Sequence, residues 1–405
     1  MTRDRTGVVT LVGTPAARPP GEPQAARSAL VLSGSIGKGH DSVAEACRVA
    51  FSDAEVPARV VDCMSMLGGA GSRAGSAVFR ELLSVPAAYD ALHFGHLRTG
   101  TWLASFLQST ATRQILPKVR AELESMRDAE GQPLVVSVFP TGVSSAAALK
   151  REVGSLTTVA ICTDACAHRM WVADGTDLYL VCSPLAATTI QRYAPDSPVV
   201  VVPPPVKPAF YATPPQRIAR DDFGVPEGAT CVLLMAGGWG LAPLAETAEA
   251  LAGAGYFVLA VAGMNTRLHA RLQAVSQRCW RVVPFGMTRR VPELMAAADV
   301  VVTSSGQSCN EARVVGRSLV ILDVVPGHGR ENTLHELEQG AAIACSPDPE
   351  SVASALRVIL AEEHEHPPWP VRSTQEWQKH FFDALASVGF DARDRARREF
   401  AREAG

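Results

Sequence analysis

The chain has 405 residues, of which 47% are hydrophobic and 20% are charged. This length predicts two or three domains and excludes a single small one. Lys and Arg number 38 against 41 Asp and Glu, and the net charge of −3 gives no general attraction for nucleic acids. No apolar run reaches the about 18 residues that a membrane-spanning helix needs, and the N-terminus lacks a secretory signal. We therefore expect a soluble cytoplasmic protein.

The nine cysteines are odd in number, and most lie singly in apolar segments. This usage favours buried thiols in a reducing compartment over a disulfide framework. The one tight group, Cys162, Cys166 and His168, has no second cysteine pair at ligand spacing. We therefore expect no metal site.

Short β-branched runs alternate with helical stretches along most of the chain, which predicts parallel, doubly wound α/β sheets. Residues 1–27 lack periodicity and are rich in Pro, Arg, Gly and Ala, so we expect a flexible tail. The alternation starts at Ser28, breaks at the proline-rich stretch 199–228 and restarts at Cys231. Proline density in that stretch excludes a helix interior and a central strand, so we expect a linker that joins two domains.

The predicted domains are an N-terminal Rossmann-like domain over 28–207 and a C-terminal one over 208–370. Helices over 371–405 are expected to pack back toward the N-terminal domain. Ser373 and Glu376 have capping-box spacing ahead of apolar Trp377, Phe381 and Leu385, which predicts a helix start. The last residues mix arginines with acids, which favours a solvated helix over a basic binding arm.

A glycine-rich loop follows the first predicted strand and runs Gly34-Ser35-Ile36-Gly37-Lys38-Gly39-His40. Such a turn lets backbone N–H groups approach an anion at a helix start. A P-loop would need Ser or Thr where Gly39 stands. A dinucleotide-binding fingerprint has a different glycine order, although Asp62 lies near the position where that fingerprint has its acidic residue. A simple packing turn is the remaining alternative. His40 favours a functional loop over a packing turn, because the positive end of a helix keeps an imidazole neutral and able to act as a base.

Two further strand-to-helix turns carry polar or glycine residues. One holds Gly237, Gly238 and Gly240; the other runs from Ser304 to Ala312. Ligands bind beyond the carboxyl ends of such strands, so the two domains are expected to hold a ligand between them. In the second turn, Gly306 and Ser308 offer donors to a phosphate, and Glu311 offers a carboxylate to vicinal hydroxyls. An ordinary capped helix with a surface Glu is the alternative.

Read together, these segments resemble the monogalactosyldiacylglycerol synthase and processive diacylglycerol glucosyltransferase group. That group shares its GT-B fold with the transferase that makes lipid II. The resemblance covers roughly residues 28–362. It rests on the order of GKGHDSVAEA, the run Thr163, Asp164, His168, Trp171 with Asp177, VVVVPPPV, Gly237 to Gly240, VAGMN, Pro284-Phe285-Gly286, Gly306 to Glu311, and Val325-Pro326-Gly327 with Asn332.

The resemblance implies a GT-B fold, with two Rossmann-like domains facing a central cleft, and transfer from a UDP-sugar with inversion and without an essential metal or other cofactor. It places the base at Phe285 and Gly286, the ribose at Glu311, and the diphosphate near Gly306, Ser308 and Gly238. The donor-binding residues it implies further are Gly237, Gly240, Asn265 and Asn332. The acceptor-binding residues it implies are Gly37, Gly39, His168, Trp171 and Trp102. A structural, hydrogen-bonded histidine is the alternative for His168, and core packing is the alternative for Trp171.

The chain departs from the family pattern at two places. Thr303-Ser304-Ser305-Gly306 stands where the family usually has Lys-Pro-Gly-Gly, and Pro326-Gly327-His328-Gly329 stands for Pro-Gly-Gln-Glu. The second change removes a polar pair expected near the sugar hydroxyls, which leaves the donor sugar open. Residues 330–332 are candidate substitutes.

A base must take the proton of the acceptor hydroxyl, and His40 and then Asp164 are the candidates. Asp164 could instead orient the histidine or the acceptor. The stretch 87–116 mixes aromatic and aliphatic residues, with Arg98 and Arg113 flanking Trp102, Phe106 and Leu107. The resemblance implies docking of a lipid acceptor at the inner membrane face here, and a helical hairpin packed on the core is the alternative. The acceptor could be a diacylglycerol, a polyprenyl carrier or a lipid-like natural product.

Two other classes of function compete with a transferase. A UDP-sugar 2-epimerase has the same two-domain fold but needs several acids around the sugar, and few are present here. A catalytically silent nucleotide-sugar-binding protein is the second alternative, because the donor motif departs from the family pattern.

Overall fold

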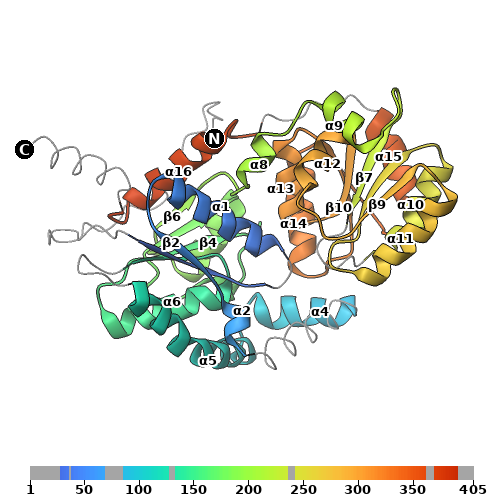
Figure 1. The fold of residues 1–405 in the computed structure, drawn as a ribbon. Helices are drawn as coiled ribbons and strands as arrows, with labels where there is room; N and C mark the ends of the chain where they lie inside the picture. Colours follow the sequence, from blue (N-terminus) through green and yellow to red (C-terminus); the bar gives the residue numbers. More distant parts are fainter. Residues whose placement is uncertain are drawn as a thin grey trace, which may run out of the picture. The chain divides into compact units, whose positions relative to one another are not determined.

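The computed structural model describes residues 28–35, 38–68, 85–126, 133–235, 242–361 and 369–390. The chain divides into two compact units (Figure 1). The first comprises Met1–Ile36, His40–Pro205 and Ser373–Gly405; the second comprises Gly37–Gly39 and Val206–Arg372. The division at 205/206 lies two residues from the predicted boundary at 207/208. The predicted tail 1–27 and the last residues, 391–405, lie outside the described ranges.

The first unit contains one six-stranded parallel sheet in the order β2-β1-β3-β4-β5-β6. Ala29 of β1 pairs with Ala58 of β2 on one side and with Leu134 of β3 on the other. The winding direction therefore reverses between β1 and β3, which makes this the switch point where such sheets hold ligands. The strands are β1 Ala29–Ser33, β2 Ala58–Asp62, β3 Leu134–Ser137, β4 Thr158–Cys162, β5 Leu178–Val181 and β6 Val199–Val201.

Helices cover the strands of the first unit, and four of its strands are buried along their whole length, as expected of a sheet covered on both faces. Leu30 and Leu32 of β1 pack in one cluster with α2, α5 and α6. The helices are α1 Gly39–Asp53, α2 Cys63–Met66, α4 Pro86–Leu92, the π-helix η1 His93–Leu97, α5 Trp102–Met126, α6 Pro140–Val153, the 3-10 turn η2 Arg169–Trp171, α7 Pro184–Tyr193 and α16 Thr374–Ala386.

The C-terminal helix α16 completes the core of the first unit. The predicted helix start is confirmed, because Ser373 is the N-cap and its hydroxyl accepts from the backbone N–H of Glu376 at 3.1 Å. Phe381 packs edge-on against Phe51 of α1 with ring centroids 5.5 Å apart, and the Trp377 indole donates to the Pro203 carbonyl. The chain thus crosses to the second unit and returns to the first.

The second unit repeats this architecture with the strand order β12-β11-β10-β7-β8-β9, all parallel, and its switch point lies between β7 and β10. The strands are β7 Cys231–Met235, β8 Phe257–Val261, β9 Val282–Phe285, β10 Val300–Ser304, β11 Ser318–Leu322 and β12 Ala342–Cys345. The helices are α8 Pro208–Tyr211, α9 Gln216–Phe223, α10 Leu244–Gly253, α11 Thr266–Arg278, α12 Val291–Ala297, α13 Gln307–Val314, α14 His328–Glu338 and α15 Pro349–Ala361.

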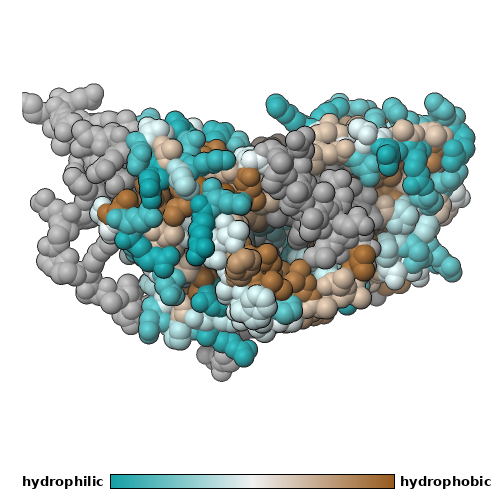
Figure 2. Space-filling view, turned by 90° about the horizontal axis from the view of Figure 1, so that it is seen from below, coloured by the Kyte–Doolittle hydropathy of each residue, from teal (hydrophilic) through white to brown (hydrophobic). Residues whose placement is uncertain are grey.

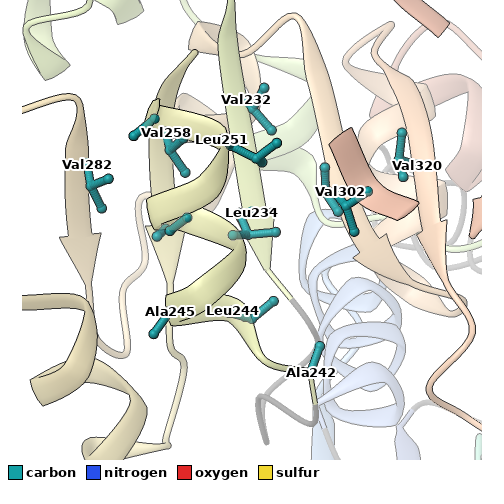
Figure 3. Close-up of a cluster of buried hydrophobic side chains, with 14 of the residues drawn as sticks. Val232, Leu234, Ala242, Leu244, Ala245, Leu251, Val258, Val282, Val302 and Val320 are labelled. Carbon is teal, nitrogen blue, oxygen red and sulfur yellow. The ribbon is translucent and has the colours of Figure 1, made fainter. Parts of the chain in front are cut away.

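Alternate residues of β7 enter two different cores. Val232 and Leu234 pack with Leu244 and Leu251 of α10 (Figure 3). Leu233 and its like-facing neighbours join a second cluster with α9 and α12. This two-sided burial explains why the strand reads as an unbroken apolar run.

The predicted linker over 199–228 contains the boundary between the two units at 205/206, but it also holds regular structure. The segment contains β6, α8 and α9. β6 is an edge strand that pairs only with β5, and Pro208 occupies the first turn of α8, where its missing N–H has no intrahelical partner. Pro215 stands just before α9 as its N-cap. Each of these prolines occupies a position that regular structure tolerates.

No helix within the described ranges is both long and apolar enough to cross a membrane.

Candidate active site

The loops at the carboxyl ends of β1, β3 and β4 bring His40, Val138 and Asp164 together in the first unit. His40 is the second residue of α1, and its Nδ1 donates to the Val138 carbonyl at 2.8 Å. A carbonyl only accepts, so Nδ1 carries the hydrogen in the neutral ring. Nε2 therefore keeps its lone pair, which is the requirement for a base.

The surroundings of His40 keep its imidazole neutral. Burial is the largest effect and lowers the pKa of His40 below its usual range, while Asp164, the Val138 carbonyl and Asp41 oppose this and raise the pKa. The ring lies edge-on to Phe139, with centroids 5.2 Å apart. At neutral pH the ring is a free base, and the Asp164 charge favours the cation that forms when it takes a proton.

Asp164 is buried, with 8% of its surface exposed, and its position is fixed by neighbours. The Trp171 indole N–H donates to Asp164 Oδ2 at 2.7 Å, and His168 Nε2 lies 3.5 Å from the same oxygen. Trp171 is itself 1% exposed. The predicted acceptor residues His168 and Trp171 therefore lie around the candidate carboxylate.

Sequence reasoning missed His93, whose ring contacts that of His168. Its ring is 1% exposed, edge-on to His168 with centroids 5.9 Å apart, and stacked on Tyr89 at 6.0 Å. Burial lowers the pKa of His93, and the Asp164 charge opposes that effect. His93 begins a π-helix, closed by the Arg98 N–H donating to the His93 carbonyl. Such helices often mark functional sites, but neither a period of two nor one of 3.6 predicts them.

The first glycine loop is held by tight packing and by Asp62. A Cβ at Gly34 would lie 2.4 Å from the Phe139 ring, so only glycine fits there. The Ser35 N–H and hydroxyl donate to the Asp62 carboxylate at 3.0 and 2.7 Å. Asp62, considered above for a dinucleotide ribose, thus braces this loop. Gly39 begins α1, and Gly37 lies outside the described residues.

The predicted diphosphate and ribose residues of the second unit follow β10. Gly306 caps α13 with φ of 148°, a conformation that requires glycine, and Ser308 lies in the first turn. Glu311, one turn further, is buried with 7% exposure. The Ser305 hydroxyl donates to the Gly329 carbonyl at 2.8 Å, which ties the start of α13 to α14.

The other predicted donor residues follow neighbouring strands at the same edge of the sheet. Phe285 ends β9 and its ring packs against Phe223, Gly286 lies beside His269, and Asn332 lies in the first turns of α14. The Asn265 side-chain oxygen accepts from the Leu268 N–H and caps α11. Gly237, Gly238 and Gly240 follow β7, which pairs with β10, but they lie outside the described residues.

The exposed start of α5 carries the remaining predicted acceptor residue. Trp102 is 79% exposed, and Phe106 and Leu107 are also exposed. Arg113 is exposed on the same helix, as expected for a flanking cation. Arg98 was also predicted to be a flanking cation, but its Nη2 lies 3.4 Å from Cys166 Sγ, inside the first unit. In the described ranges, no three His, Cys, Asp or Glu side chains form a group that could hold a metal ion.

Comparison with solved structures gives the fold. A UDP-glucosyltransferase from Polygonum tinctorium that glucosylates indoxyl matches 93% of this chain and 98% of its own, with a TM-score of 0.55 and 14% identity. Os79 from O. sativa, solved with U2F and a trichothecene, matches 93% of this chain and 100% of its own, with a TM-score of 0.56 and 14% identity. The fold is GT-B.

The sequence relatives of this GT-B chain carry the names of enzymes that glycosylate lipids. It is 26% identical over 244 residues to the processive diacylglycerol beta-glucosyltransferase of Bacillus subtilis, covering 58% of this chain and 63% of that one. It is 31% identical over 165 residues to a probable chloroplastic monogalactosyldiacylglycerol synthase of Nicotiana tabacum, covering 38% and 30%. The chain thus matches less than two-thirds of the length of these curated relatives. No family model matches the sequence.

Proposed function

We propose that the protein is an inverting, metal-independent glycosyltransferase that moves a hexose from a UDP-sugar to a hydroxyl of a lipid or lipid-like acceptor. The observation that carries the proposal is the His40 arrangement. Its Nδ1 is engaged by Val138 and its neighbour Asp164 favours the imidazolium, so Nε2 is left to act as a base. The named functions of the sequence relatives support the same class of reaction.

In this mechanism, His40 Nε2 takes the acceptor proton as the acceptor oxygen bonds to the anomeric carbon. The bond from that carbon to the diphosphate breaks, so the sugar inverts through an oxocarbenium-like state. Asp164 stabilises the charged His40 ring. Donors preorganised toward developing charge are typically worth about 3–4 kcal/mol each.

The second unit supplies donors for the departing diphosphate. Gly306 and Ser308 stand at the N-terminal end of α13, where backbone N–H groups and the helix dipole favour an anion. We assign the ribose hydroxyls to Glu311 and the base to the Phe285–Gly286 turn. The sugar is assigned to the start of α14, where Arg330, Glu331 and Asn332 stand in for the polar pair that the sequence lacks.

The lipid acceptor is assigned to the outer face of α5. Trp102, Phe106 and Leu107 are 79%, 59% and 48% exposed, and Figure 2 shows hydrophobic residues gathered around the region where Figure 1 draws α4 and the adjoining end of α5. Residues 102–120 contain no Asp or Glu, and Arg113 is exposed among them, whereas Arg120 pairs with Glu152 and Lys118 donates to the Met66 carbonyl. A helix with exposed aromatic residues and an exposed cation suits the anionic inner face of a membrane, which the protein would touch without spanning.

A two-step experiment tests the proposal. A thermal-shift screen across UDP-, GDP- and TDP-sugars is expected to show stabilisation by the uridine compounds. Transfer from the selected donor to diacylglycerol in phosphatidylglycerol vesicles should then yield an inverted glycoside and should persist in excess EDTA. A C2 epimer formed from the donor alone would favour an epimerase instead. UDP binding with no transfer to diacylglycerol, polyprenol or small phenolic acceptors would favour a silent binding protein.

A further inference from the structure

The segment that carries the exposed apolar residues is bonded to the loop that carries Asp164. The Arg98 carbonyl accepts from the Arg169 N–H at 3.1 Å and from the Tyr193 hydroxyl at 2.7 Å. The Arg98 guanidinium reaches Cys166 Sγ at 3.4 Å. One residue of the η1–α5 connection therefore contacts the Asp164 loop on both sides of His168.

Gly100 allows the connection to lie close to Arg169 of the Asp164 loop. Its φ is +72°, and a Cβ built on it would lie 2.2 and 2.8 Å from Cγ and Cβ of Arg169. Any other residue would have to push the connection and the loop apart. The Gln108 side chain, in the second turn of α5, adds a second attachment by donating to the Met170 carbonyl at 2.8 Å.

The same connection leads directly into the apolar face, which we define as Trp102, Phe106 and Leu107. Only Thr101 separates Gly100 from Trp102, and the Thr101 hydroxyl is hydrogen-bonded to His96 of the π-helix at 2.9 Å. A displacement of the apolar face therefore acts on a helix that is bonded to the Asp164 loop through Gln108 and preceded by the Arg98–Gly100 contact.

We propose that the connection Arg98–Gly100 couples docking of the apolar face on a lipid bilayer to the position of Asp164, with Arg98 as a positioning residue. The inference rests on the proposed function. The bilayer is the occupant because exposed Trp102 and Phe106 share their helix with exposed Arg113, and no Asp or Glu lies between Trp102 and Arg120. Arg120 pairs with Glu152 and Lys118 donates to the Met66 carbonyl, so Arg113 is the cation assigned to anionic lipid.

The coupling has a definite chemical consequence. The Asp164 charge raises the pKa of His40 against the effect of burial. When the loop moves away from His40, that support weakens, so the pKa of His40 falls and its imidazolium becomes less stable during transfer. Docking that fixes the loop is expected to raise turnover by about 5- to 150-fold, the usual range of coupling between sites.

The test compares Arg98→Lys and Gly100→Ala with two matched controls in the full chain. Arg151→Lys makes the same change at an exposed arginine of α6 that has no assigned role, and Gly95→Ala adds a methyl group in the π-helix where nothing lies within 4 Å. Amide exchange at Arg169 is followed with and without phosphatidylglycerol vesicles. Turnover is measured across pH with diacylglycerol in vesicles and with a short-chain diacylglycerol dispersed as monomers.

In the wild type and both controls, vesicles should slow exchange at Arg169 and turnover should be higher on vesicles than on monomers. In Arg98→Lys and Gly100→Ala, exchange at Arg169 should be at least about fivefold faster, the vesicle advantage should fall toward one, and the acidic limb should move to lower pH. Vesicle binding and UDP binding should stay unchanged. If Gly100→Ala does not fold, Arg98→Lys still tests the coupling.

Vesicles that bind the wild type without changing exchange at Arg169 would overturn the coupling, as would variants that keep the vesicle advantage. A wild type that transfers no sugar in either acceptor form would instead refute the proposed function. The exchange measurement needs no turnover, so the two failures are distinguishable.

Discussion

The indole N–H of Trp171 donates to Oδ2 of Asp164 at 2.7 Å, and both side chains are buried. Burying a carboxylate costs free energy unless the carboxylate is hydrogen-bonded, so this contact fixes the position of the negative charge in the site. The same indole ring lies 6.3 Å from the His40 ring, between centroids.

Trp171→Phe keeps an aromatic ring in the core and removes the donor. Because it leaves a buried charged acceptor without this bond, we expect a loss of about 1–3 kcal/mol in the free energy of unfolding and a lower turnover. Urea unfolding and steady-state kinetics measure the two effects. Trp280→Phe in the second unit is the control, because Trp280 is 63% exposed; equal losses in both variants would contradict the assignment.

Asp164→Asn keeps the shape of the side chain and removes its charge. The Asp164 charge raises the pKa of His40, so its removal should lower that pKa further below the usual range. The acidic limb of the pH–turnover profile should therefore move to lower pH while turnover falls. An acidic limb that stays in place, or moves to higher pH, would show that Asp164 does not act through His40.

Stability should decrease on mild acidification. The pKa values of His40 and His93 are lowered in the folded protein, chiefly by burial. The unfolded chain then binds more protons below about pH 6.5, so the free energy of unfolding should fall from there until both folded rings are protonated. Urea midpoints between pH 7.5 and 5 measure this slope. His93→Phe should reduce the slope; an unchanged slope would exclude His93 as a contributor.

Gly34→Ala tests the packing of the first glycine loop. The added Cβ would meet the Phe139 ring at 2.4 Å, and overpacking of this kind typically costs about 1–3 kcal/mol. Displacing Phe139 should also disturb the adjacent His40 ring and lower turnover. Gly253→Ala at the end of α10 is the matched control, because nothing lies within 4 Å of its Cβ position. Similar stability of the two variants would contradict the close fit.

The sequence predicted the strands well because buried parallel strands read as unbroken apolar runs, as in Cys231–Met235. Over 199–228 it predicted the linker but not β6, α8 and α9, because proline suits an edge strand and helix starts as well as it suits a linker. It could select His40 and Asp164 separately, since each follows a strand. It could not show that Trp171 fixes Asp164, because that bond joins residues seven apart through an irregular turn.

His93 was out of reach for a different reason. Its inward position depends on a π-helix and on packing against His168, and no local pattern encodes either. The low pKa of His40 was expected from its place at a helix start, whereas burial is the largest cause in the structure. The order of the strands, which places the loops after β1 and β3 next to each other, also depends on long-range pairing.

The most direct test of the account is His40→Ala, measured for turnover and UDP affinity on the same preparation. If Nε2 of His40 is the base, turnover should fall by about 10²- to 10⁴-fold while UDP affinity stays nearly constant, because the residues assigned to the nucleotide belong to the second unit. His40→Ala that retains most of its turnover, while Asp164→Asn loses it, would contradict the account and transfer the role of base to Asp164.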